Sequence, residues 1–171
     1  MDITRSKYPF AEVGSVASLI QYGTSQKANT SSDGTPVIRM NNLVDGQLDL
    51  RNLKHIRLNA NETDKLTLLD GDILFNRTNS KELVGKCAVF HEQDRYVFAS
   101  YLIRVRLDIS RANPDFISFV LNSPIGRQQI DALSRQIIGQ ANVNSEELRS
   151  LQIPLPPLPV QQAMMKRVEA G

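Results

Sequence analysis

The chain has 171 residues, 41% of them hydrophobic, which is enough for one globular domain with its own core. Acidic and basic residues are interspersed and the formal net charge is only +2, so charge alone does not indicate a nucleic-acid-binding face. The single cysteine excludes an intrachain disulfide, and the sequence shows neither a membrane-spanning apolar run nor an N-terminal signal-peptide core, so we expect a cytoplasmic protein without membrane contact.

The first two thirds of the chain are predicted to be mostly β. A short helix is expected over residues 16–20, followed by a polar loop to residue 34. Strands are expected over residues 36–40, 47–50 and 55–58, with Asp45-Gly46 as a hairpin turn signal. Residues 63–69 remain ambiguous between helix and strand.

The strongest strand signal covers residues 96–107, which are rich in β-branched and aromatic side chains. Ile103 and Val105 alternate there with Arg104 and Arg106, as expected of a strand with one apolar face.

Residues 69–89 predict a hairpin with an apolar stem and a polar loop. A tight turn at Asp70-Gly71 precedes a short apolar strand, and a second strand follows the loop. The loop carries Arg77, Asn79, Ser80 and Lys81. Arginine pairs with guanine, asparagine with adenine, and hydroxyl and ammonium groups with phosphate oxygens. Composition alone nevertheless favours a solvated loop.

The last third changes to helical signals. Asn113-Pro114 predicts a helix through about residue 121, and Ser123-Pro124 predicts another through about residue 136. Residues 139–144 are expected to form a loop, and Asn144 with Glu147 forms a capping-box pattern for one helical turn. Residues 151–155 then predict a strand at a sheet edge, because a proline within it cannot donate to a ladder.

The C-terminal stretch predicts a stiff connector followed by a helix. The connector is the PPLP sequence of residues 156–159, and residues 160–168 are helical in pattern. We therefore divide the chain into a domain over residues 1–155 and a connector with the start of a helix over residues 156–171. The fold class is mixed α+β, β-rich first and with short helices later.

Four short motifs resemble one known family. The sequence GDILFNRTNS at residues 71–80, followed by Val84-Gly85-Lys86, is similar to a hairpin of target-recognition domains in the specificity subunits of type I restriction-modification systems. The motifs PVIRMNNL at residues 36–43, GQANVN at 139–144 and IPLPPLPVQ at 153–161 occur in the family order. Together they cover about residue 13 to the C-terminus. The resemblance implies a β-rich target-recognition domain that ends in the stub of a spacer helix.

The resemblance also implies a function. Such a domain reads one half of a bipartite duplex DNA site and directs separate methyltransferase and restriction subunits. It pairs with a second recognition domain or half-subunit through the spacer helix. Here that helix has only two to three turns, too few for a stable coiled coil, so we expect a boundary cut rather than a natural half-subunit. Val160 stands where the family often has Glu, which weakens any polar contact inferred there.

Ten side chains are the DNA-binding candidates that the resemblance assigns by position: Arg39, Asn41, Asn42, Arg77, Asn79, Ser80, Lys81, Lys86, Gln140 and Asn142. Arg77 ranks first, because its immediate neighbours offer no acid. The two lysines are expected to contact phosphate rather than bases. The asparagines at 41 and 42 fit equally well as turn residues bonded to their own backbone, and Gln140 and Asn142 share this ambiguity.

Enzyme readings find no support in the sequence. No acid and lysine stand one residue apart, as a metal-dependent nuclease strand requires, and the cofactor loop and the Asn/Asp-Pro-Pro-aromatic motif of an adenine methyltransferase are absent. Asp72 is expected to serve the Asp70-Gly71 turn. Cys87 and His91 lack further ligands nearby and predict a core cysteine and a surface histidine. We therefore expect no catalytic residue, metal or cofactor.

Two alternatives to the specificity subunit stay open. The first is the recognition domain of a fused type II methyltransferase-endonuclease, which would use the same module. The second is a protein-interaction module without DNA contact, built on residues 156–158 and the apolar Met164, Met165 and Val168.

Overall fold

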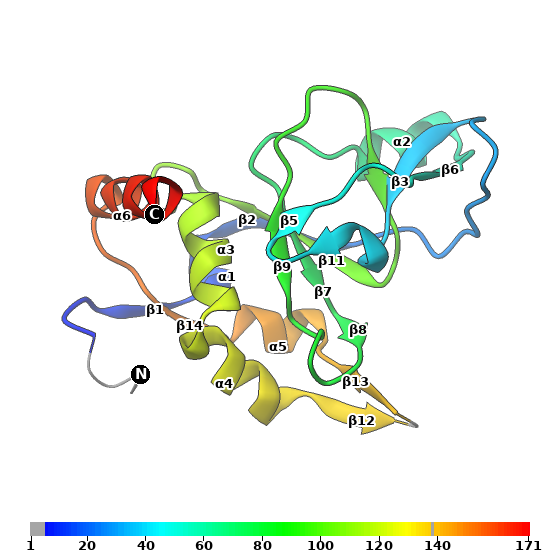
Figure 1. The fold of residues 1–171 in the computed structure, drawn as a ribbon. Helices are drawn as coiled ribbons and strands as arrows, with labels where there is room; N and C mark the ends of the chain where they lie inside the picture. The colour runs from blue at the N-terminus through cyan, green and yellow to red at the C-terminus, as the bar shows by residue number, and fades with distance from the viewer. Residues whose placement is uncertain (1–5, 138) are drawn as a thin grey trace.

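The computed structural model describes residues 6–137 and 139–171. A four-stranded antiparallel sheet of order β2-β11-β7-β9 forms its centre (Figure 1). Its strands are β2 (Ala17–Tyr22), β11 (Leu102–Leu107), β7 (Ile73–Asn76) and β9 (Cys87–Val89). The predicted hairpin stem, β7 and β9, is thus confirmed and lies next to the strongest predicted strand.

Two three-stranded sheets extend from the centre. One has the order β10-β3-β6, with β10 (Val97–Phe98), β3 (Thr35–Ile38) and β6 (Lys54–Ile56). The other has the order β12-β13-β8, with β12 (Arg135–Ile137), β13 (Gln140–Asn142) and β8 (Thr78–Asn79). Figure 1 shows β3 and β6 at the upper right and β12 and β13 at the bottom, with β7 leading into β8 between them.

Two short strand pairs complete the β structure. β1 (Phe10–Glu12) pairs with β14 (Gln152–Pro154), which confirms an edge position for the proline-containing strand. β4 (Leu43–Val44) pairs with β5 (Gln47–Leu48) across the Asp45-Gly46 turn, as predicted. Asp45 and Gly46 have φ of 51° and 78°, the left-handed conformations that a two-residue hairpin turn requires.

The helices are short, and three of them are directly preceded by an asparagine that caps the first turn. They are α1 (Val13–Val16), the 3-10 helix η2 (Met40–Asn42), α2 (Ala60–Leu66), α3 (Pro114–Asn122), α4 (Pro124–Leu133), α5 (Ser145–Arg149) and α6 (Leu158–Ala170). The side chains of Asn59, Asn113 and Asn144 each accept a hydrogen bond from a backbone N–H three residues on. This is N-capping, and at Asn144 the predicted capping box is complete.

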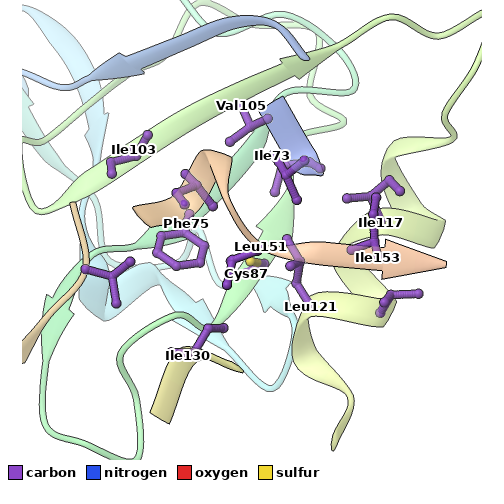
Figure 2. Close-up of a cluster of buried hydrophobic side chains, with 14 of the residues drawn as sticks. Ile73, Phe75, Cys87, Ile103, Val105, Ile117, Leu121, Ile130, Leu151 and Ile153 are labelled. Carbon is purple, nitrogen blue, oxygen red and sulfur yellow. The ribbon is translucent and has the colours of Figure 1, made fainter. Parts of the chain in front are cut away.

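The core has two parts because side chains alternate across the central sheet. One face carries Ile73, Phe75, Ile103 and Val105, which pack against α3 and its neighbours (Figure 2). The other face carries Leu74 and Leu102, which pack with residues of the β10-β3-β6 sheet: Val37, Ile38, Ile56, Val97 and Phe98. The central sheet is therefore covered on both faces.

Two sequence predictions at the start of the sheet were wrong. The helix expected over residues 16–20 is a single turn at Val13–Val16, and residues 17–22 instead form β2, an edge strand on β11. The single strand expected over residues 96–107 is divided into β10 and β11, which belong to different sheets. In both cases pairing with distant strands decides the local structure.

Two further boundaries differ in the last third. The helix expected through residue 136 ends at Leu133, and the loop expected over residues 139–144 contains β13. β13 pairs with β12 on one side and with β8 on the other, where Ala141 lies opposite Asn79. The backbone groups of residues 140–142 therefore have ladder partners that local sequence does not reveal.

The burial of Arg104 and Asp72 is the largest departure from the sequence predictions. The predicted alternation of β11 holds, but the side chain of Arg104 points into the second part of the core and is 1% exposed. Asp72 accepts a hydrogen bond from the Leu69 N–H, as turn chemistry predicts. It is also buried, and its carboxylate oxygens lie 3.1 Å from Arg104 Nη1 and 2.8 Å from Arg106 Nε. Burial lowers the pKa of Arg104, and the adjacent Asp72 carboxylate opposes that shift.

Helix α6 is tied to the domain by Gln161, which is buried. Its Oε1 accepts from the Asn113 N–H at 2.8 Å, and its Nε2 donates to the carbonyls of Arg111 and Pro156 at 3.0 and 2.8 Å. The start of α6 is thus fixed to the start of α3. Within the described part of the chain, no helix is long and apolar enough to cross a membrane.

Candidate nucleic-acid interface

Arg77 lies where β7 passes into β8, which corrects its expected place in the polar loop of the predicted hairpin. Its N–H donates to the Tyr101 carbonyl at 3.0 Å, and its own carbonyl accepts from the Val143 N–H at 2.8 Å. The turn itself comes later, at residues 81–85. The backbone of Arg77 is therefore held by two segments that are distant in sequence.

The Arg77 side chain is half-buried and also held in place. Its Nε donates to the Ser100 carbonyl at 2.6 Å. Its Cζ lies 5.1 Å from the ring centroid of Tyr22 and 5.9 Å from that of Tyr101, which is cation–π distance. Tyr22 and Tyr101 are 40% and 48% exposed. Among the described residues, no carboxylate lies within ion-pair distance of Arg77, so its charge is not neutralised.

The β8-β13 pairing brings separate candidate residues together. Asn142 lies opposite Thr78, and its Oδ1 is 3.5 Å from Arg77 Nη1. Asn79 neighbours Ala141 in the ladder, and its Nδ2 is 3.5 Å from Met40 Sδ. Residues of three of the four motifs are thus in contact around Asn79, and two of the motifs supply side chains to a common surface. We call this surface the Arg77 face and define it as Tyr22, Arg77, Asn79, Tyr101 and Asn142.

Asn42 does not belong to an accessible surface, which corrects its assignment as a DNA contact. It is 3% exposed. Its Oδ1 accepts from the Arg39 N–H and its Nδ2 donates to the Asp49 carbonyl, both at 2.9 Å. The turn-residue reading is therefore the right one for Asn42. Asn41 beside it is exposed, and Arg39 is half-buried with an Nε that has no hydrogen-bond partner within the described residues.

Three further candidates, Ser80, Lys81 and Gln140, lie outside the Arg77 face. Ser80 opens the turn, where its carbonyl accepts from the Leu83 and Val84 N–H groups. Lys81 is exposed on this turn, and Gln140 is exposed at the start of β13. Neither has a side-chain contact to the Arg77 face in the described residues.

Lys86 lines a different feature, a groove of about 920 Å³ between the β4-β5 hairpin, β9, α3 and α6. Four carboxylate residues share this lining: Asp45, Glu92, Asp115 and Glu169. Phosphate groups are repelled by such a lining. The structure therefore groups Lys86 with an acidic groove and not with the Arg77 face.

Cys87 and His91 have the structural roles that the sequence predicts. Cys87 is buried, and burial raises the pKa of its thiol to about 12, so a reactive thiolate is not populated near neutral pH. His91 is a surface residue whose Nδ1 and Nε2 lie 2.6 and 2.9 Å from carboxylate oxygens of Asp70 and Asp115. The described residues contain no cluster of His, Cys, Asp and Glu able to hold a metal ion.

Sequence reasoning missed three residues of the site: Tyr22, Ser100 and Tyr101. The break in the β-branched run at Ser100-Tyr101 is a weak signal for a turn between two strands. No pattern, however, connects Tyr22 to Arg77, because β11 lies between β2 and β7 in the central sheet.

Comparison with known proteins identifies one family. A family model described as the type I restriction modification DNA specificity domain matches residues 6–170. The specificity subunit of the type I restriction enzyme EcoKI of Escherichia coli is 29% identical over 158 residues, 91% of this chain and 34% of that protein. A putative MjaX specificity subunit of Methanocaldococcus jannaschii is 26% identical over 157 residues, 91% of this chain and 37% of that protein. The chain spans about a third of the length of these relatives.

Solved structures share the fold. The HsdS subunit from Thermoanaerobacter tengcongensis superposes with a TM-score of 0.70 at 19% identity, covering 97% of this chain and 42% of that chain. The type IIG restriction endonuclease BpuSI superposes with a TM-score of 0.64 at 8% identity, covering 94% of this chain and 26% of that chain.

Proposed function

The chain belongs to the family of type I restriction modification DNA specificity domains, and we propose that it is one target-recognition domain that reads half of a bipartite duplex DNA site. The Arg77 face is the observation that carries this proposal. It joins an unneutralised guanidinium, two carboxamides and two exposed tyrosines from separate segments. These are groups that pair with base edges in the major groove and contact the sugar-phosphate backbone.

Within this proposal the domain itself carries out no chemistry. It directs separate methyltransferase and restriction subunits, which act on the DNA that it selects. The burial of Cys87 and the carboxylate partners of His91 support this division of labour, since neither residue is free to act as a nucleophile or base.

We propose a boundary near residue 155. Residues 1–155 form the recognition domain, and residues 156–171 form the connector and the start of the spacer helix. The contacts of Gln161 support a fixed direction for this helix, since they join its first turn to the start of α3. A second recognition domain or half-subunit would pair through the continuation of α6.

A fused type II methyltransferase-endonuclease is the second candidate. The fold likeness to a type IIG enzyme supports it, because the same module occurs there. The EcoKI and MjaX relatives favour the type I assignment, since their similarity extends over 91% of the chain and both are specificity subunits. The two candidates differ in whether the methyltransferase is a separate chain or part of the same one.

The experiment is a fluorescence-polarisation titration of the chain against a pool of randomised duplexes at low and moderate salt, followed by sequencing of the bound fraction. The proposal predicts an enriched short motif and affinity that falls steeply with salt, because phosphate contacts release counterions. Arg77→Ala should abolish the enrichment, whereas Lys86→Ala, in the acidic groove, should retain it. Binding without enrichment, or none at all, would contradict the proposal and favour a protein-interaction module.

A further inference from the structure

We propose that Arg77 reads a guanine in the half-site and that Tyr22 and Tyr101 hold its guanidinium in the reading position. This inference rests on the proposed function. It goes beyond that function by naming the base, the residue that reads it and the residues that position the reader.

The hydrogen bonds of Arg77 leave one edge of the guanidinium open. Its Nε–H is used by the Ser100 carbonyl at 2.6 Å. The Nη1 contact to Asn142 Oδ1 is 3.5 Å, at the limit of a hydrogen bond, and the described residues give Nη2 no acceptor. Nη1 keeps a second N–H and Nη2 keeps both of its own, so the two amino groups together can donate to two adjacent acceptors.

Only guanine presents two adjacent acceptors to such a pair of donors. In the major groove guanine offers O6 and N7, whereas adenine offers one acceptor beside a donor, thymine one acceptor beside a methyl group, and cytosine a donor. An end-on arginine fork thus has two good hydrogen bonds with guanine and at most one with any other base.

The charge of Arg77 is also kept available. Arg104 and Arg106 share the carboxylate of Asp72, and Arg51 pairs with Asp49. Arg77 instead has a carbonyl and two aromatic rings as partners, none of which cancels its charge. An arginine that served packing alone would gain more from a carboxylate.

Tyr22 is anchored through its side-chain hydroxyl and Tyr101 through its backbone. The Tyr22 hydroxyl accepts from the Ser145 N–H at 2.8 Å, and the Tyr101 carbonyl accepts from the Arg77 N–H at 3.0 Å. Arg77, Tyr22 and Tyr101 are thus fixed by α5, β11 and the β7-β8 junction. Ordering a flexible arginine before it meets DNA lowers the entropic cost of binding.

The test uses the half-site enriched from the randomised pool, with each guanine replaced in turn by 7-deazaguanine, which lacks the N7 acceptor. At one position the wild-type chain should lose about tenfold in affinity, the scale of a bidentate arginine-guanine pair. Arg77→Ala, which removes the guanidinium fork, should bind less tightly and show no further loss at that position.

Tyrosine variants test the positioning role at the same guanine. Tyr101→Phe keeps the ring and should retain the 7-deazaguanine effect, whereas Tyr101→Ala should reduce both the affinity and this effect. Circular dichroism of each variant separates loss of reading from loss of fold.

The outcomes separate the two proposals. An enriched motif without guanine, or 7-deazaguanine effects that are the same in wild type and Arg77→Ala, would overturn the guanine inference while leaving DNA recognition in place. A pool without any enrichment would overturn the proposed function, and the guanine inference with it.

Discussion

Asp72 and Arg104 face each other inside the protein, with Arg104 Nη1 3.1 Å from Asp72 Oδ2 and both side chains 1% exposed. Arg104 also donates to the carbonyls of Thr67 and Lys65 at 2.8 Å. The buried charges are therefore paired and hydrogen-bonded, the condition under which such a pair is tolerated. The pair fixes the turn that starts β7, and β7 leads directly to Arg77.

Asp72→Asn should destabilise the fold by about 3–5 kcal/mol, because it leaves the Arg104 charge buried without a counter-charge. Urea unfolding followed by circular dichroism measures this loss. Asp64→Asn is the matched control. Asp64 is 72% exposed, and its Oδ1 lies 3.9 Å from Arg95 Nη1, the long distance of a weak surface ion pair. This variant should lose under about 1 kcal/mol in the free energy of unfolding. A loss in Asp72→Asn as small as the one expected for Asp64→Asn would show that the buried pair is not a major contributor to stability.

Gln161→Ala should cost about 2–3 kcal/mol in the free energy of unfolding, because it removes the partners of the Asn113 N–H and of two carbonyls. Its neighbour Gln162 is exposed on α6, so Gln162→Ala should change stability by under about 0.5 kcal/mol. Chemical denaturation compares the two variants. Equal stability would mean that α6 is not held by the contacts of Gln161.

His91 should make stability pH-dependent. Partial burial lowers its pKa, but the hydrogen bonds that His91 donates to Asp115 and Asp70 outweigh this, and the net shift is upward from 6.5. The protonated form is thus favoured in the fold. Its stabilisation is fully present below the unfolded pKa near 6.5 and is lost as pH rises through the higher folded pKa.

The check is the stability difference between wild type and His91→Gln across this pH range. The difference should be under about 1 kcal/mol, because the side chain is half exposed. It should be largest near pH 5.5 to 6 and shrink toward pH 8. A difference that stays constant over the range would contradict the charged bridge between Asp70 and Asp115.

Asn42→Ala and Asn41→Ala separate a structural asparagine from an exposed one. Asn42→Ala should cost about 1–3 kcal/mol in unfolding free energy, because the Arg39 N–H and the Asp49 carbonyl lose their buried partner. Asn41→Ala should leave stability within about 0.5 kcal/mol of wild type. Thermal melts of both variants measure these losses. A larger loss for Asn41→Ala than for Asn42→Ala would show that residues 39–49 pack differently.

Features that depend on a few neighbouring residues could be predicted from the sequence. The caps at Asn113 and Asn144 and the Asp45-Gly46 hairpin were right, because each uses hydrogen bonds or dihedral angles within about four residues. The division of residues 96–107 and the strand character of residues 140–142 could not be predicted. Both follow from pairing with strands that lie far away in the sequence.

Some residues of the candidate site could likewise be predicted from the sequence and others could not. Family-like motifs located Arg77, Asn79 and Asn142, and the structure shows how β8-β13 pairing brings them together. Tyr22 and Ser100 could not be found, since their contact with Arg77 depends on the order of strands in the central sheet. The burial of Asn42 and the placement of Lys86 likewise depend on packing and not on motif.

The most direct test of the account is nuclear magnetic resonance of the ¹⁵N-labelled chain titrated with its enriched duplex. Recognition by the Arg77 face predicts that the largest amide shifts fall on residues 77–80, 100–101 and 140–143. Shifts concentrated instead on α3 and the β4-β5 hairpin, around the acidic groove, would contradict it.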